Sequence, residues 1–163
     1  MPKVVCNSSP LIHLSKAGRL NLLREFFQEI LVPEEVLVES VENSCGAEDA
    51  KEIEKADWIH PIAIENMDLK MALKLTLDEG EAAAIVLALE QKADLVLMDD
   101  YDGRAMAKEY NLKVIGTIGI LLKAKLEGKT ISLRNDLDLL RKNGFWLSEE
   151  LYLKFITEAN EAQ

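Results

Sequence analysis

The chain has 163 residues, of which 48% are hydrophobic, and its formal net charge is −10 at pH 7. Its size fits one globular domain, and it contains no run of about 20 apolar residues that could span a membrane. The acidic charge excludes attraction of nucleic acid by the overall field of the protein, although the same charge also serves solubility.

The first half of the chain alternates strand and helix patterns. A short apolar run ends at Asn7-Ser8-Ser9-Pro10, where Ser or Asn can cap a helix and Pro fits its first turn. In chain order, we predict a strand at 3–6, two short helices separated at Gly18, a strand at 29–32, a helix opened by Pro33, a charged helix at 47–56, an extended edge segment at 58–64 and a short helix at 68–75.

The second half continues the alternation. We predict a helix at 78–91, a buried strand at 94–98, a helix at 103–110, a strand at 112–115, a helix from 116 to about 127, and amphipathic helices at 133–142 and 148–161. Strands that alternate with helices predict an α/β fold, a three-layer α/β/α sandwich around a central, mainly parallel sheet. We expect one domain over residues 1–163, with a core at 1–127. The helices of 128–163 either cover the sheet or form a dimer surface.

Polar residues follow the predicted strands at the end where parallel sheets bind ligands. The helix that begins near Gly116 also turns its free backbone N–H groups toward an anion. The candidate residues at this edge are Asn7 and Ser8 after the first strand, Glu39 on the helix after the second, Asp99 and Asp100 after the buried strand, and Thr117 at the last helix start.

Asp99 and Asp100 form the sharpest local signal. Adjacent carboxylates at the end of a buried strand repel each other unless a cation or a donor compensates them. Mg²⁺ and Mn²⁺ are hard ions that prefer such oxygen ligands. Helix capping explains the same residues, since Asp100 or Asp102 could cap the helix that begins near Gly103.

Glu81 also has two interpretations. Asp78 and Glu81 have the spacing of a capping box, and so do Thr76 and Glu79. At roughly 100° per residue, Glu81 lies about 40° from the core position Ile85, whereas Glu79 lies about 120° away. Glu81 is therefore expected near the sheet, where it could bind a metal as well as cap the helix.

Several other classes of site lack support. His13 and His60 have no ligand partner three or four residues away, and Cys6 and Cys45 lack zinc-ligand spacing. Glycine-rich nucleotide-binding motifs and a nucleophile elbow are absent from the sequence. No basic and apolar leader precedes the first strand, which favours a cytoplasmic protein.

In their order and spacing, these motifs resemble the PIN-domain family, and in particular a branch of it that has asparagine in the first motif. The first motif is the strand that ends at Asn7-Ser8, and the second is the helix from Pro33 to Glu39. The third is the Ala-rich helix start at Glu81. The segments that carry the resemblance are 4–12, 32–39, 80–85, 95–100, 103–107 and 114–119.

The resemblance implies a divalent-metal-dependent nuclease that usually acts on RNA. Many members of the family are toxins of toxin–antitoxin pairs, and many are dimers. By position, the residues around Mg²⁺ or Mn²⁺ would be Asn7, Glu39, Glu81, and Asp99 or Asp100. Ser8 could bond a metal-bound water, and Arg104 or Lys108 could meet a phosphate, as could the helix start at Thr117. An ion pair with Asp100 or Asp102 is the alternative for Arg104.

Asn7 departs from the family motif, which has Asp at this position. An amide offers one oxygen but lacks the charge that attracts a cation, so we expect weaker metal binding, with Asp99 as a hypothetical compensation. The alternatives to a ribonuclease are a catalytically weak or inactive PIN-like module that binds nucleic acid or protein, and a dimeric scaffold built on the C-terminal helices.

Overall fold

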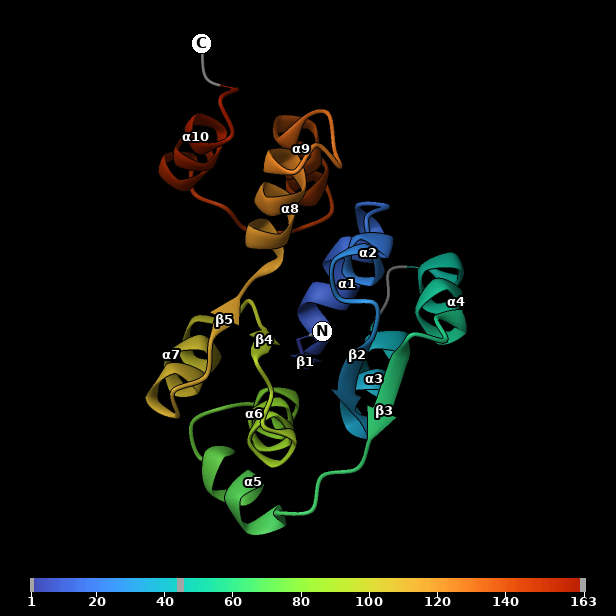
Figure 1. The fold of residues 1–163 in the computed structure, drawn as a ribbon, viewed down its shortest axis with the longest axis vertical. Coiled ribbons are helices and arrows are strands. Elements are labelled where there is room, and N and C mark those ends of the chain that lie inside the picture. The colour runs from blue at the N-terminus through green and yellow to red at the C-terminus, as the bar shows by residue number, and fades with distance from the viewer. Residues whose placement is uncertain (1, 44–45, 162–163) are drawn as a thin grey trace.

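A computed structural model describes residues 2–43 and 46–161 of the chain. Within these residues, five strands form one sheet in the order β3-β2-β1-β4-β5, and every neighbouring pair is parallel (Figure 1). The strands are β1 (Val4–Cys6), β2 (Ile30–Pro33), β3 (Ile59–Ile62), β4 (Leu95–Leu97) and β5 (Val114–Ile115). The α/β prediction with a parallel sheet is confirmed.

The helices follow the predicted pattern closely. They are α1 (Ser8–Lys16), α2 (Asn21–Phe27), α3 (Glu34–Glu42), α4 (Ala47–Lys55), α5 (Met67–Leu73), α6 (Glu79–Gln91), α7 (Tyr101–Glu109), α8 (Thr117–Leu126), α9 (Leu133–Lys142) and α10 (Glu149–Glu158). The main differences are that α7 begins two residues earlier than predicted and α10 ends three residues sooner. Asp100 sets the start of α7, because it caps this helix.

The order of the strands explains their sequences. The central strand β1 is buried over its whole length, as a strand covered on both faces must be, and its three residues are apolar. At the edge, β3 contains Pro61, which lies opposite Val32 and has no N–H to donate. The edge position predicted from this proline is confirmed.

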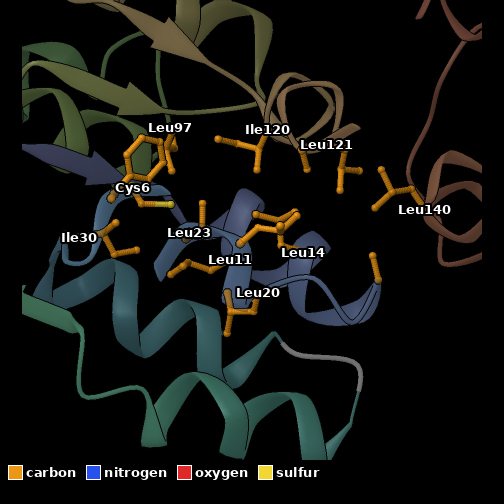
Figure 2. Packing of buried hydrophobic residues seen from close by; sticks show 14 of the residues in the cluster. Cys6, Leu11, Leu14, Leu20, Leu23, Ile30, Leu97, Ile120, Leu121 and Leu140 are labelled. Atoms are coloured by element: carbon orange, nitrogen blue, oxygen red, sulfur yellow. The ribbon is translucent and has the colours of Figure 1, made fainter. Parts of the chain in front are cut away.

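The sheet separates two hydrophobic clusters, because successive residues of a strand point to opposite faces. Val4, Cys6 and Leu97 pack with α1, α2 and α8 on one face, as Figure 2 shows for Cys6, Leu97 and their neighbours. Val5 and Val96 pack with α5, α6 and α7 on the other. Helices on both faces confirm the three-layer prediction.

The two C-terminal helices extend the first of these layers. In Figure 1, α9 and α10 lie beyond α8, and α9 contacts both α8 and α10. Their buried residues Leu137 and Ile156 belong to the same cluster as the core of α1. Arg19 adds an ion pair to Asp136 of α9 at 3.1 Å. No helix in the described part of the chain is both long and apolar enough to cross a bilayer.

Candidate functional site

A cleft of about 510 Å³ opens at the carboxyl ends of β1 and β4. The five side chains predicted to form a catalytic site all line it, namely Asn7, Glu39, Glu81, Asp99 and Asp100. A larger hollow of about 760 Å³ lies at the opposite ends of the strands, where Lys3 and Arg24 stand among the acids that line it. The smaller cleft is the better candidate, because its acids come together at the edge where parallel sheets bind ligands.

Asn7 links the strand β1 to the helix α1. Its N–H donates to the Leu97 carbonyl at 2.9 Å, which fixes the residue at the end of the sheet. It stands at the cap position of α1, but its side chain makes no capping hydrogen bond, so the capping predicted for this residue does not occur. Asn7 is only 5% exposed, and its Oδ1 has no hydrogen-bond partner within the described residues. Burying such an oxygen costs about 1–3 kcal/mol, which a ligand could offset.

Glu39 faces Asn7 across Gly80. Ser8 Oγ donates to Glu39 Oε1 at 3.1 Å, so Ser8 orients this carboxylate. A Cβ at Gly80 would lie 2.7 Å from Glu39 Oε2 and 3.1 Å from Asn7 Oδ1. Both oxygens therefore border one small space that glycine leaves open. Burial raises the pKa of Glu39, with a smaller contribution from the charge of Asp78, and the Ser8 hydrogen bond opposes this shift.

Glu81 caps its helix, as one of its two interpretations predicted, and it also lines the cleft. It forms a capping box with Asp78: Glu81 N–H donates to Asp78 Oδ1 at 2.8 Å, and Asp78 N–H donates to Glu81 Oε2 at 3.2 Å. Only 8% of the residue is exposed, and it lines the cleft. Burial, followed by the charges of Asp78 and Asp100, raises the pKa of Glu81 to about 7. A nearby cation would offset this accumulation of negative charge.

Asp99 is held by donors of the protein itself. Its Oδ1 accepts from Thr117 N–H at 2.7 Å, and its Oδ2 accepts from Thr117 Oγ1 at 2.7 Å and from Ser9 Oγ at 2.9 Å. The anion at the N-terminus of α8 is therefore the Asp99 carboxylate. Thr117 is completely buried, which argues against its predicted contact with nucleic acid.

Asp100 is the freer member of the pair. Its Oδ2 accepts from Gly103 N–H at 3.1 Å, so Asp100, and not Asp102, caps α7. The residue is exposed in the cleft, and its Oδ1 has no hydrogen-bond partner in the described part of the chain. Asp100 is thus better placed than Asp99 to bind a ligand.

The predicted phosphate contacts lie on α7. Arg104 Nη1 donates to the Met98 carbonyl at 3.4 Å, and a Cβ at Gly116 would meet both this nitrogen and Asp99 Oδ1. Within residues 2–43 and 46–161, Arg104 forms no ion pair, so the alternative pairing with Asp100 or Asp102 is absent. Lys108 is exposed, and neither cation lines the cleft.

One wall of the cleft was missed by the sequence interpretation. The loop between α9 and α10 brings Phe145 and Trp146 to the cleft, beside His13 and Lys16 of α1. The Phe145 ring meets the His13 ring edge-on, with 4.8 Å between centroids. Burial lowers the pKa of His13, against a smaller opposing effect of Asp99. An aromatic pair after a helix-ending glycine was the only sequence signal for this wall.

The acids of the cleft suit a divalent ion that is held by a few oxygen ligands and by water. They do not form a complete set of protein ligands around one point. Among the described residues, no group of three or more His, Cys, Asp or Glu side chains is close enough to hold a metal directly. The available donors are all oxygens, and one of them, Asn7 Oδ1, is buried without a partner. Mg²⁺ usually keeps several waters and takes only one or two carboxylates, which suits such an open arrangement.

Comparison with protein families gives a match over nearly the whole chain. The matching family model describes a PIN domain and covers residues 3–161. No curated protein matches the chain. PIN domains are generally metal-dependent nucleases.

Proposed function

Because the chain belongs to the PIN-domain family, we propose that it is a divalent-metal-dependent ribonuclease that hydrolyses phosphodiester bonds. The observation that carries the proposal is the acidic cleft, which Glu39, Glu81 and Asp100 line together with Asn7, whose buried Oδ1 has no hydrogen-bond partner among the described residues. A ribonuclease of this class needs oxygen ligands for a metal beside room for a phosphate, and the cleft offers both.

The residues of the cleft would have different roles, namely metal binding and the orientation of a metal ligand. Asn7 and one or two of the carboxylates of Glu39, Glu81 and Asp100 would bind Mg²⁺ or Mn²⁺ directly, and the remaining acids would contact it through water. When bound, such an ion activates a water and offsets the charge that builds on the phosphate. Ser8 orients Glu39 through its hydrogen bond.

Other residues would support this centre from outside it. Asp99 fixes the start of α8 and so holds one side of the cleft in place. Arg104 and Lys108 on α7 are the proposed contacts to phosphates of the RNA that lie beyond the cleft.

Cleavage of a labelled single-stranded RNA tests the proposal. We expect Mn²⁺-dependent cleavage that EDTA abolishes and that Glu81→Gln reduces by about 100-fold or more. Glu109→Gln is the matched control, since Glu109 is exposed at the far end of α7 and does not line the cleft. Equal cleavage by wild type and Glu81→Gln would show that the activity arises elsewhere.

The alternative is a catalytically weak or inactive PIN-like module that binds nucleic acid or protein. Two observations favour it. Asn7 stands where the family motif has Asp, and both oxygens of Asp99 already accept hydrogen bonds from the protein. This alternative predicts RNA binding without cleavage in Mg²⁺ or Mn²⁺. If it holds, Asn7→Asp should create metal-dependent cleavage, because it restores the missing charge.

The cellular role belongs to the same proposal. The chain would act in the cytoplasm as a homodimer and as the toxin of a toxin–antitoxin pair. Growth arrest on induced expression, relieved by a protein encoded beside it, would support the toxin role. Light scattering gives the oligomeric state, and a monomer would contradict the dimer.

A further inference from the structure

The loop between α9 and α10 is firmly held on both sides of Trp146. Before it, Gly144 has a φ of 93° and donates to the Arg141 carbonyl at 3.1 Å, and Phe145 N–H donates to the Leu140 carbonyl at 2.9 Å. After it, the Leu147 carbonyl accepts from Arg141 Nη2 at 2.9 Å. The backbone at Trp146 is thus held in place by its neighbours on both sides, which keeps this residue beside the cleft.

The side chains in this loop have different environments. Phe145 and Leu147 pack against the main hydrophobic cluster. Trp146, between them, is 82% exposed and lines the acidic cleft. In the described part of the chain, no other ring and no cation stacks on its indole. Single exposed apolar residues are common, but this one is large and flat, and it borders the candidate site.

The charge of the cleft indicates what such a ring could bind. Acidic side chains repel the phosphates of RNA, and among the described residues that line the cleft, Lys16 is the only Lys or Arg. Stacking of a base on an indole does not depend on net charge, and every base has a face to stack. Stacking is therefore the contact best able to retain RNA in a cleft of this charge.

We propose that Trp146 stacks on an unpaired base of the RNA substrate, while Lys16 contacts the phosphate beside that base. The inference rests on the proposed ribonuclease function and makes Trp146 a positioning residue for single-stranded RNA. A base inside a duplex is already stacked on its neighbours, so the wall formed by Trp146 would favour unpaired segments.

Binding measured in EDTA tests this role without cleavage. Fluorescence anisotropy with a labelled, unstructured RNA should show binding about ten-fold weaker for Trp146→Ala and near-wild-type binding for Trp146→Phe. Leu75→Ala removes another highly exposed apolar side chain away from the cleft and should bind like wild type. A blunt RNA duplex should bind more weakly and should not distinguish wild type from Trp146→Ala.

Cleavage in Mn²⁺ then separates the two proposals. If Trp146→Ala raises KM about ten-fold with little change in kcat, both proposals stand. If wild type binds RNA through Trp146 but does not cleave it, the stacking inference stands and the nuclease proposal fails. Unchanged RNA affinity and KM in a folded Trp146→Ala protein would overturn the stacking inference alone, and so would failure of wild type to bind the RNA.

Discussion

The two sides of the acidic cleft differ in how their oxygens are bonded. On the side of α8, Asp99 receives three hydrogen bonds from Ser9 and Thr117. On the side of α6, Asn7 Oδ1 is buried and has no hydrogen-bond partner among residues 2–43 and 46–161, and Glu39 Oε2 faces the space above Gly80. A carboxylate whose donors are all in place stabilises the fold, whereas oxygens left without donors are costly unless a ligand completes them. The difference indicates a structural role for the first side and supports the proposed ligand binding at the second.

The largest expected effect is a pH dependence of the stability of the protein, caused by Glu81 on the side of α6. The pKa of Glu81 is raised from 4.5 to about 7 in the folded protein, so the folded state binds the proton more tightly than the unfolded state. Between these values, stability should fall as pH rises, by up to about 3 kcal/mol, and it should level off above the folded pKa. The pKa of Glu39 is also raised, and Glu39 contributes with the same sign.

Urea unfolding between pH 5 and 8 measures this slope. Glu81→Gln should remove most of this decrease in the free energy of unfolding with pH, because the glutamine side chain does not titrate. Mn²⁺ should reduce the slope in wild type if the cleft binds the ion. The lowered pKa of His13 gives a slope of opposite sign over the same interval, so the assigned shift is contradicted if Glu81→Gln leaves the slope unchanged.

Asp99→Ala tests the bonded side and should destabilise the fold by about 2–3 kcal/mol. The substitution leaves the Thr117 N–H and hydroxyl without their acceptor at a completely buried position. Thermal unfolding gives the change, and the expected decrease in Tm is several degrees for a chain of this length. If the variant is as stable as wild type, Asp99 does not have the structural role assigned to it.

Gly80→Ala tests the space between the two unbonded oxygens, with an expected net loss of about 1–2 kcal/mol. The added Cβ would lie 2.7 Å from Glu39 Oε2, although alanine is also the better helix former, which offsets part of the strain. We expect a larger effect on metal binding, since the methyl group fills the space that both oxygens border. Calorimetric titration with Mn²⁺ should show weaker binding than in wild type, and an unchanged affinity would place the ion elsewhere.

Asn7→Ala should have the smallest net effect on stability, below about 0.5 kcal/mol, because the removal of a buried oxygen that has no partner among the described residues offsets the packing that the side chain loses. It is the matched counterpart of Asp99→Ala in the same cleft. The stabilisation that Mn²⁺ gives to wild type should nevertheless decrease in this variant, because a ligand oxygen is gone. A large loss of stability without metal would mean that the amide is structural after all.

Local signals were sufficient for most of the fold. The turn at Asn7-Ser8-Ser9-Pro10, the proline at position 61 and the buried apolar run before Asp99 gave the correct elements and the correct edge of the sheet. They worked because caps, prolines and burial act over a few residues. The same signals brought Glu39 and Glu81 to the predicted end of the sheet.

The remaining features depend on contacts between distant residues. Sequence spacing could not distinguish Asp99 from Asp100, because the difference comes from donors at Ser9 and Thr117. It also gave no reason to place Trp146 near Asn7, since that proximity follows from the packing of α9 on α8. Spacing predicts which residues share an edge, and tertiary packing decides which of their atoms remain free.

The Phe145 ring on His13 joins residues that lie far apart along the chain. During synthesis, the acidic residues of the cleft have all been made once Asp100 is added, whereas the aromatic wall requires residues made much later. Contacts of such long sequence separation form late, because a long loop must close before they contribute. A nascent chain therefore acquires its carboxylates first and the aromatic wall of the cleft last, so that this wall is in place only when the C-terminal helices have folded.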